Sequence, residues 1–264
     1  FVRQVERNEM SEFETHPMLL ALAKLDLWHA QIDLGKLTVR FMGQQGVNRV
    51  DRLSEDDFVR NELAYLDGVK ESPIEKTQDI VLYGFGRIGR LMARLLVERT
   101  STGEVIRLKA IVVRPAGHGD LAKRAGLFTA DSVHGAFQGT VRVDEENNCL
   151  IANGNVIKVI YADSPEEIDY TDYGIDDALI IDNTGKWRDE DGLSLHLKAR
   201  GASKVILTAP GKGNLKNIVY GINDDQMSPD DKIITAASCT TNAIAPVLKV
   251  INDKTKVIIS IFAG

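Results

Sequence analysis

The sequence predicts an α/β protein with a doubly wound, mostly parallel sheet and a helical N-terminal extension. Two observations lead to this fold class. From residue 79 to residue 237, short β-rich runs alternate with helical stretches, which is the order typical of an open parallel sheet. Residues 1–77 instead place apolar residues near helical spacing. We therefore expect a helical extension over 1–77, an α/β domain over 78–238, and a helix that begins a further domain over 239–264.

The composition is that of a globular protein, with 264 residues, 44% of them hydrophobic and 27% charged. These values favour one or two domains and exclude a disordered chain, a collagen and a small disulfide scaffold. A net charge of −6, without a basic stripe, argues against nucleic-acid binding. No apolar run approaches a membrane span, and two cysteines are too few for a disulfide framework. We expect a cytoplasmic protein with no membrane partner.

Two helices are predicted in the extension. The first lies within residues 18–34, where apolar residues recur at Leu19, Leu22, Ala23 and Trp28. The second begins at residues 54–57, which resemble a capping box with Asp57 in place of the usual Glu. It is predicted to continue through Phe58, Leu63 and Tyr65 and to end at Gly68 and Ser72-Pro73. We find no chemistry in this part and interpret it as a packing or assembly extension.

Six strands are predicted in the α/β domain, over residues 80–83, 108–113, 157–161, 178–182, 204–208 and 232–235. They are apolar throughout, as expected for strands buried on both faces. A helix over 88–99 is expected to face the sheet through Leu91, Leu95 and Leu96. A last helix is predicted from the spacing of Ile244, Val247, Leu248 and Ile251. Pro246 indicates either a kink in this helix or a start a few residues after Cys239.

The stretch Gly84-Phe-Gly86-Arg-Ile-Gly89 directly follows a predicted strand and opens a predicted helix. This is the setting that the dinucleotide-binding fingerprint of Rossmann domains requires. Gly84 would allow the tight turn, Gly86 the approach of a pyrophosphate, and Gly89 close packing of helix on sheet. The motif favours nucleotide binding over a merely structural glycine turn.

Arg114 follows the second predicted strand, where such domains usually carry an acid that binds the adenosine ribose. An arginine there could accept a 2′-phosphate, which makes NADP a candidate beside NAD. The alternative is that Arg114 simply points into solvent. NAD and NADP therefore both stay open as cofactors.

Cys239 lies near the predicted start of the last helix, within Ala237-Ser-Cys-Thr-Thr-Asn242. There the helix dipole and free N–H groups favour a thiolate, the nucleophilic form of cysteine. The alternative is an inert buried thiol, but the small and hydroxyl-bearing neighbours favour a reactive one. Cys149 follows the polar residues 144–148 without such a setting, and we interpret it as incidental.

Further short motifs accompany the glycine loop and the cysteine. They are Asp131-Ser-Val-His-Gly135, Asn183-Thr-Gly185, Thr208-Ala-Pro210, Tyr220-Gly-Ile-Asn223 and Ala245-Pro246. Together, and in this order, these motifs resemble those of the glyceraldehyde-3-phosphate dehydrogenase family. The resemblance covers about residues 79–254.

The resemblance implies the phosphorylating oxidation of glyceraldehyde 3-phosphate to 1,3-bisphosphoglycerate, a step of glycolysis, with inorganic phosphate and NAD or NADP. Cys239 would form a thiohemiacetal, hydride transfer would leave a thioester, and phosphate would cleave it. Ser238 and Thr240 would flank the nucleophile and bind substrate. The implied cofactor-binding residues, with Arg114 added from its strand end, are Gly84, Phe85, Gly86, Arg87, Ile88, Gly89, Arg114, Thr184, Gly185 and Thr208. No metal is expected.

The sequence departs from the family pattern at the catalytic base. The family uses a histidine beyond the cysteine helix, whereas this sequence places all five before Cys239, at His16, His29, His118, His134 and His196. We interpret His134 as structural and His196 as an exposed helical position. The family's adenine-end arginine is absent from residues 161–165, and its second cysteine is Ala243 here.

Residues 255–264 do not resemble the family's continuation. We therefore expect the chain to be an incomplete, inactive piece of an enzyme that is a homotetramer at full length. Two alternatives stay open. One is an erythrose-4-phosphate-type dehydrogenase, which would share every motif. The other is a non-catalytic dinucleotide-binding or redox-sensing protein whose N-terminal helices form an interaction surface.

Overall fold

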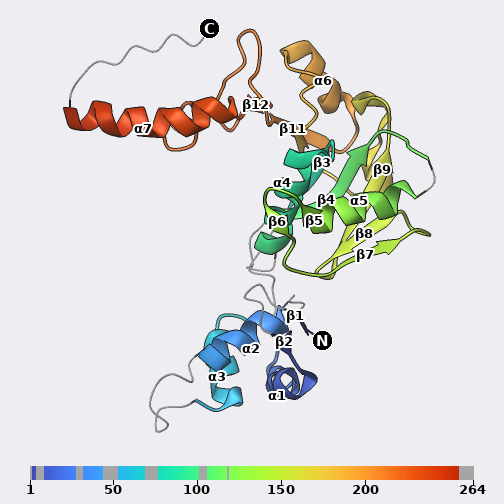
Figure 1. Ribbon diagram of the computed structural model, residues 1–264, viewed down its shortest axis with the longest axis vertical. Coiled ribbons are helices and arrows are strands. Elements are labelled where there is room, and N and C mark those ends of the chain that lie inside the picture. Colours follow the sequence, from blue (N-terminus) through green and yellow to red (C-terminus); the bar gives the residue numbers. More distant parts are fainter. Residues whose placement is uncertain are drawn as a thin grey trace.

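The computed structural model describes residues 2–3, 9–27, 32–43, 53–68, 77–100, 106–117 and 119–255. Trp28, His29, Ser72-Pro73, His118 and residues 256–264, which entered the predictions above, lie outside these ranges. The described residues of the N-terminal part form the antiparallel pair β1–β2 and the helices α1, α2 and α3 (Figure 1). Their bounds are β1 Val2–Arg3, β2 Glu9–Met10, α1 Glu12–Leu22, α2 Leu34–Gly43 and α3 Glu55–Glu62.

The first helix differs from its prediction in extent. Helix α1 ends at Leu22, so no single helix covers 18–34. It buries Met18 and Ala21 against Leu37 and Phe58 of α2 and α3, whereas Leu19 is 51% exposed. Leu22 packs against the same cluster, so the apolar spacing indicated a helix but not which of its residues the neighbouring helices bury.

Helix α3 begins where the sequence predicts. Ser54 is its N-cap, and the side chain of Ser54 accepts a hydrogen bond from the N–H of Asp57 at 3.1 Å. The helix ends at Glu62, earlier than predicted, with Leu63 as its C-cap. Tyr65, expected within the helix, lies beyond it and is 68% exposed.

The α/β part is built on an eight-stranded sheet of order β12-β11-β10-β3-β4-β9-β8-β7. Strands β12 to β9 in this order are parallel, and β8 and β7 are antiparallel. The strands are β3 Gln78–Tyr83, β4 Ile106–Val113, β7 Val141–Asp144, β8 Cys149–Ala152, β9 Asn155–Tyr161, β10 Ala178–Asp182, β11 Ala202–Leu207 and β12 Ile233–Thr235. All six predicted strands are present, and the parallel part has the order of a doubly wound domain.

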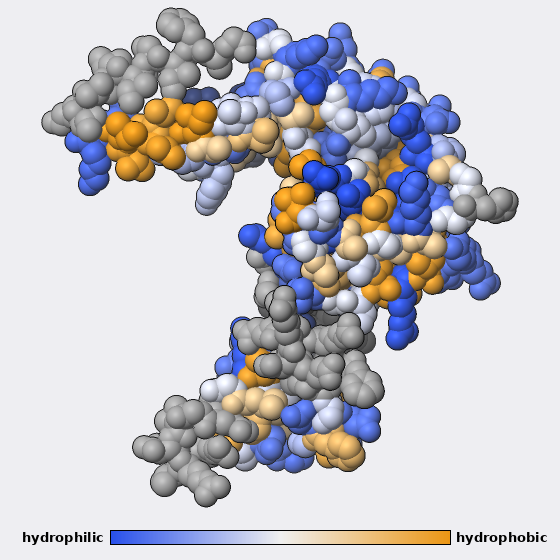
Figure 2. Space-filling view, in the orientation of Figure 1, coloured by the Kyte–Doolittle hydropathy of each residue, from blue (hydrophilic) through white to orange (hydrophobic). Residues whose placement is uncertain are grey.

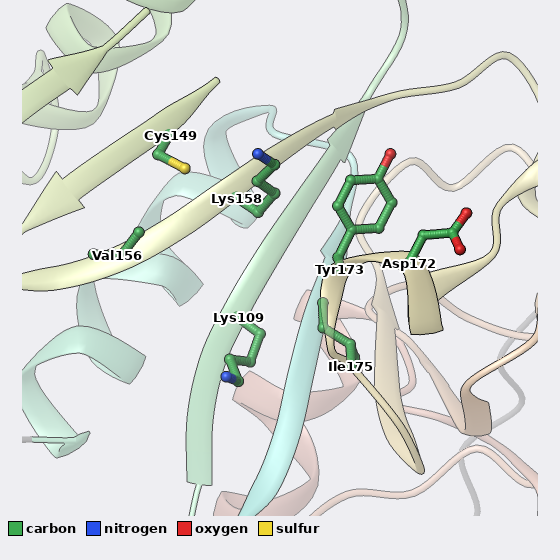
Figure 3. A pocket seen from close by; sticks show the side chains of 7 residues that line it. All are labelled: Lys109, Cys149, Val156, Lys158, Asp172, Tyr173 and Ile175. Atoms are coloured by element: carbon green, nitrogen blue, oxygen red, sulfur yellow. The ribbon is translucent and has the colours of Figure 1, made fainter. Parts of the chain in front are cut away.

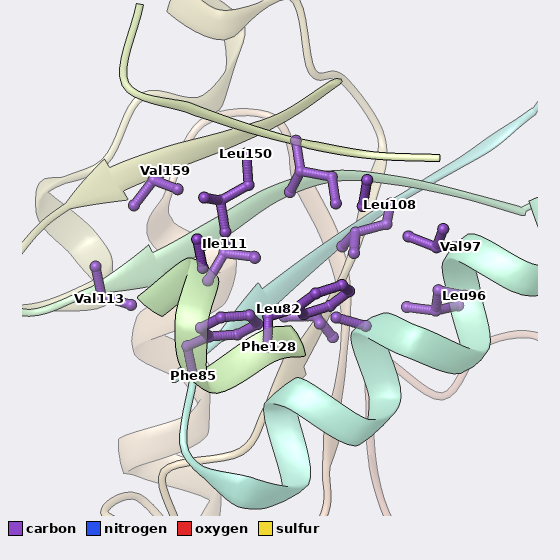
Figure 4. Close-up of a cluster of buried hydrophobic side chains, with 14 of the residues drawn as sticks. Leu82, Phe85, Leu96, Val97, Leu108, Ile111, Val113, Phe128, Leu150 and Val159 are labelled. Carbon is purple, nitrogen blue, oxygen red and sulfur yellow. The ribbon is translucent and has the colours of Figure 1, made fainter. Parts of the chain in front are cut away.

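Helices cover both faces of this sheet (Figure 1). Helices α4 Arg87–Thr100 and α5 Asp120–Thr129 share one buried cluster with the sheet (Figure 4), and α6 Glu190–Lys198 contributes to a second cluster on the opposite face. Leu96 of α4 is buried as predicted, but Leu95 is 53% exposed. Leu95 lies one helical step, about 100°, from Leu96 and so faces away from the sheet.

The remaining elements are short. A two-stranded pair joins β5 Ala130–Asp131 to β6 Gly135–Ala136. In the described residues, 3₁₀ turns cover Pro165–Glu167, Tyr170–Tyr173 and Asp224–Gln226. The antiparallel hairpin of β7 and β8 was not predicted from the sequence. It buries Cys149 to 5% exposure, so this residue packs in the sheet.

Helix α7 Cys239–Thr255 projects from the end of the sheet (Figure 1). It begins at Cys239 with Pro246 inside it, so the later start that Pro246 allowed does not occur. Its exposed apolar residues gather in one place in Figure 2 and are Ile244, Val247, Val250 and Ile251. Within the described part of the chain, no helix combines the length and hydropathy of a membrane span.

Candidate dinucleotide crevice and cysteine turn

The predicted site residues follow the carboxyl ends of the parallel strands. The glycine loop follows β3, Arg114 follows β4, residues 183–185 follow β10, and Thr208 follows β11. The turn that leads to Cys239 follows β12. Parallel strands end at one edge of a sheet, so these segments share that edge. The strand order reverses between β3 and β10, the point where open α/β sheets bind ligands.

The glycine loop is closely packed on one side and open on the other. Gly84 has a φ of +93°, and a Cβ added there would lie 2.7 Å from Thr184 Cγ2. A Cβ added at Gly89 would lie 2.3 Å from the carbonyl oxygen of Gly84. At Gly86 no heavy atom would lie within 4 Å. The backbone at Gly86, at the start of α4, is therefore accessible to a ligand phosphate, as the fingerprint requires.

The side chains of the loop differ in accessibility. Phe85 is buried, and its ring stacks on Phe128 with centroids 6.1 Å apart. Its side chain therefore belongs to the core, and only its backbone faces the loop. Arg87 and Ile88 have exposed side chains.

A charge cluster that the sequence did not reveal lies beside the loop. The carboxylate of Asp131 accepts hydrogen bonds from the N–H groups of Val133 and His134 at 3.0 and 2.9 Å, and from His134 Nδ1 at 3.0 Å. Arg87 and Arg90 also lie within 3.9 Å of it. These hydrogen bonds, the backbone N–H of His134 first, hold the pKa of Asp131 well below its usual range. His134 thus has a structural partner, in line with its interpretation from sequence.

Arg94, also missed, ties the same segment to α4. Its buried guanidinium donates to the carbonyl of Phe128 from Nε and Nη2, at 2.9 and 2.6 Å, and to that of Gly135 at 3.0 Å. The available signal was that Arg94 falls among the apolar positions of its helix. An arginine buried there needs several hydrogen-bond acceptors nearby.

The wall of the crevice opposite Gly84 rests on a buried polar network. Asp182 Oδ1 accepts hydrogen bonds from the N–H and Oγ1–H of Thr184 at 2.6 and 2.7 Å. Asp182 Oδ2 lies 2.9 Å from Nε2 of His196 on α6. His196 is 0% exposed, so its predicted exposed position was wrong. The helix turns His196 toward the sheet, where it meets the carboxylate that ends β10.

Two aromatic residues enclose this network. Tyr83 and Trp187 pack edge-to-face with the His196 ring, with centroids 4.7 and 5.6 Å from it. Burial raises the pKa of Tyr83 well above its usual range. Thr208 Oγ1 lies 3.0 Å from the carbonyl oxygen of Asp182, so the end of β11 is joined to the same wall.

Arg114 is exposed directly after β4. Gly185 has a φ of +62° and follows Thr184 in the crevice wall. The roles assigned to these two residues in cofactor binding stay predictions.

The cysteine turn is held by local hydrogen bonds. Ala237 adopts a φ of +56°, which is uncommon for a residue with a Cβ. Ser238 Oγ accepts a hydrogen bond from the N–H of Thr241 at 3.0 Å, which caps α7. Asn242 Nδ2 donates to the carbonyls of Ala236 and Ser238 at 2.7 and 2.9 Å. The turn leaves Cys239 exposed as the first residue of the helix.

A hydroxyl group lies beside the Cys239 thiol, whose Sγ is 4.0 Å from Thr240 Oγ1. Two of the described histidines have carboxylate partners, because His134 pairs with Asp131 and His196 with Asp182. Within the described part of the chain, Cys239 Sγ has no hydrogen bond to a histidine.

An open groove of about 370 Å³ lies on the sheet away from the crevice (Figure 3). Its lining residues are Lys109, Cys149, Val156, Lys158, Asp172, Tyr173 and Ile175. None of them is a predicted site residue. Burial raises the pKa of the Cys149 thiol, which disfavours a nucleophilic role there. Over the residues that the structure covers, no cluster of His, Cys, Asp and Glu is arranged to hold a metal ion.

The fold and the glycine loop define a doubly wound domain of the dinucleotide-binding class. Residues 78–190 match the family model described as glyceraldehyde 3-phosphate dehydrogenase, NAD binding domain. Residues 78–190 thus belong to the NAD-binding domain of the glyceraldehyde-3-phosphate dehydrogenase family. The resemblance found in the sequence motifs is confirmed.

Three curated relatives extend this result. The chain is 55% identical over 252 residues to a glyceraldehyde-3-phosphate dehydrogenase-like protein of Pseudomonas aeruginosa, across 96% of this chain and 54% of the relative. It is 42% identical over 176 residues to the glyceraldehyde-3-phosphate dehydrogenase of Thermotoga maritima, across 66% of this chain and 49% of the relative. It is 36% identical over 204 residues to the chloroplastic glyceraldehyde-3-phosphate dehydrogenase A of Zea mays, across 77% of this chain and 48% of the relative. The chain spans about half the length of these relatives, and the first match, across 96% of this chain, includes most of its N-terminal extension.

Proposed function

We propose that the chain binds NAD or NADP in the crevice between β3 and β10 and presents Cys239 as the nucleophile of a phosphorylating aldehyde dehydrogenase. The observation that carries this proposal is the glycine loop, open at Gly86 and closed against the wall at Gly84 and Gly89. The free N–H groups at the start of α4 favour a pyrophosphate there. Family membership supports glyceraldehyde 3-phosphate and inorganic phosphate as substrates.

The chemistry assigned to the chain's own residues begins at Cys239. Its thiolate adds to the aldehyde carbon, and the carbonyl oxygen takes up a proton to give a thiohemiacetal. The thiohemiacetal carbon then loses its hydrogen as hydride, which bound NAD⁺ or NADP⁺ would accept, and its hydroxyl group loses a proton, so that a thioester remains on Cys239. Inorganic phosphate then displaces Cys239 as thiolate and forms the acyl phosphate. Thr240, next to the nucleophile, is proposed to position that phosphate, and the Cys239 N–H to stabilise the oxyanion.

Arg114 provides the test of cofactor choice. Calorimetric titration of the chain with NAD and NADP is expected to show binding of at least one of them. If Arg114 contacts the 2′-phosphate, Arg114→Asp should weaken NADP by about tenfold or more, while NAD changes little. Equal effects on both dinucleotides would exclude that contact.

Cys239 provides the test of chemistry. Oxidation of glyceraldehyde 3-phosphate that is lost in Cys239→Ser supports the proposed enzyme, and erythrose 4-phosphate serves as the competing substrate. Cysteine alkylation that responds to dinucleotide, without aldehyde oxidation, would instead favour a non-catalytic redox-sensing protein. We also propose, from family membership, that the full-length protein is a homotetramer and lies in the cytoplasm.

A further inference from the structure

The Asp182 carboxyl group lies behind the crevice and has three donors in its surroundings. Two belong to Thr184, through its N–H and Oγ1–H, and the third is Nε2 of His196. Asp182 and His196 are both 0% exposed. A buried carboxyl that loses one such partner is left with unsatisfied bonding capacity, which is costly inside a protein.

The hydrogen-bond pattern fixes the form of the histidine. A carboxylate only accepts hydrogen bonds, so Nε2 of His196 carries the hydrogen that points to Asp182. The other ring nitrogen, Nδ1, is buried and has no hydrogen-bond partner among the described residues. A hydrogen on Nδ1 would be an unsatisfied buried donor, so the arrangement suits the Nε2–H tautomer.

The same pattern occupies the hydroxyl of Thr184. Its hydrogen goes to Asp182, and its oxygen accepts the N–H of Lys186 at 3.1 Å. Thr184 faces the glycine loop with its methyl group, and its Cγ2 is the heavy atom nearest to a Cβ added at Gly84. The residue therefore shapes the crevice through packing and does not have a free hydroxyl donor for a ribose.

We propose that the buried Asp182–His196 pair is a positioning pair, which holds the wall formed by Thr184 and Gly185 against Gly84 and thereby sets dinucleotide affinity. Neither Asp182 nor His196 contacts the ligand in this proposal. The predicted effect on affinity rests on the proposed dinucleotide binding, whereas the positioning of the wall does not. The two can therefore be tested separately.

The test compares two replacements of His196 in the full chain. His196→Gln keeps an N–H donor for Asp182, whereas His196→Leu fills the space without one. The first readout is hydrogen exchange of the Thr184 N–H. The second is the Kd for NAD and NADP. Ile157→Ala, a fully buried change in the other cluster, controls for general loss of stability.

We expect His196→Leu to speed exchange at Thr184 and to weaken dinucleotide binding, each by about tenfold or more. His196→Gln should stay within about threefold of the wild type in both, and Ile157→Ala should leave the Kd within about twofold despite a lower Tm. Nitrogen NMR should show His196 as the Nε2–H tautomer. If His196→Leu does not fold, His196→Asn, whose amide is too short to reach Asp182, replaces it with the same expectation.

The outcomes separate the two proposals. Unchanged exchange at Thr184 in His196→Leu, or equal loss in the Leu and Gln variants, would overturn the positioning pair. Faster exchange with an unchanged Kd would overturn its link to affinity. A wild-type chain that binds neither dinucleotide would end the proposed function, while exchange at Thr184 would still decide whether the pair positions the wall.

Discussion

The dinucleotide crevice and the cysteine turn lie at the same sheet edge but are held in different ways. The crevice wall at Thr184 is fixed by hydrogen bonds that join β10 to α6 and β11. The cysteine turn is fixed mainly by hydrogen bonds between residues 236 and 242. Beyond the turn, α7 exposes an apolar face. The crevice is therefore built into the core of the fold, whereas the nucleophile is placed by the local start of one helix.

This difference has a consequence for how each region responds to change. A substitution in the crevice should alter folding and binding together, because its atoms are shared with the core. A substitution in the cysteine turn should act locally and leave the crevice intact. The three predictions that follow test this separation, from the largest expected effect to the smallest.

Gly89→Ala should have the largest effect. The added Cβ would lie 2.3 Å from the Gly84 carbonyl oxygen, so α4 and the loop must move apart. Such overpacking costs about 1–3 kcal/mol of stability. Because the moved backbone is the proposed pyrophosphate site, dinucleotide affinity should fall by more than about 100-fold. Thermal unfolding and calorimetric titration measure the two effects.

Gly126→Ala is the matched control. Gly126 lies within α5, and a Cβ there would have no heavy atom within 4 Å. This change should leave binding unaltered and raise stability by up to about 1 kcal/mol, since alanine favours a helix. A Gly89→Ala variant that binds dinucleotide like the wild type would show that the crevice is not as tightly built as the structure indicates.

The second prediction compares the two cysteines. Cys239 is exposed, whereas Cys149 is buried and its pKa is raised by that burial. Iodoacetamide should therefore modify Cys239 at least about tenfold faster than Cys149, followed by mass spectrometry. Cys239→Ser should remove the fast reaction and leave dinucleotide affinity within about twofold. Comparable alkylation rates at both thiols would contradict the difference in exposure. A large loss of dinucleotide affinity in Cys239→Ser would show that the cysteine turn and the crevice are coupled.

What the sequence predicted well was local. The glycine loop needs only its own residues and the strand before it, and β10 was predicted with its observed bounds because buried parallel strands are continuous apolar runs. The six predicted strands were found as continuous apolar runs. The hairpin of β7 and β8 was missed because its first strand, Val141–Asp144, instead alternates apolar and polar residues at the sheet edge. A period-2 alternation was the signal that could have found it.

What the sequence could not predict was set by distant contacts. His196 was assigned to solvent because its helix shows only a partial apolar pattern, and its partner Asp182 lies on a strand 14 residues earlier. An acid that ends a buried apolar strand was the available signal, since such a group needs donors nearby. The contacts of Asp131 with Arg87 and Arg90 were missed for the same reason, because these arginines lie on α4, far from Asp131 in the sequence.

The smallest predicted effect concerns the cap of α7. Ser238→Ala removes the oxygen that accepts the Thr241 N–H, a change that costs about 0.5–2 kcal/mol at a helix N-terminus. Because the cysteine turn is held locally, the loss should appear as faster hydrogen exchange at Thr241 and an altered rate of Cys239 alkylation. The Tm of the α/β domain and the Kd for dinucleotide should not change.

Ser194→Ala, which removes only an exposed hydroxyl that donates to a carbonyl within α6, is the control. A lower domain Tm in Ser238→Ala alone would mean that the cap supports the sheet edge as well as the helix, and the nucleophile would then be coupled to the crevice through the end of β12.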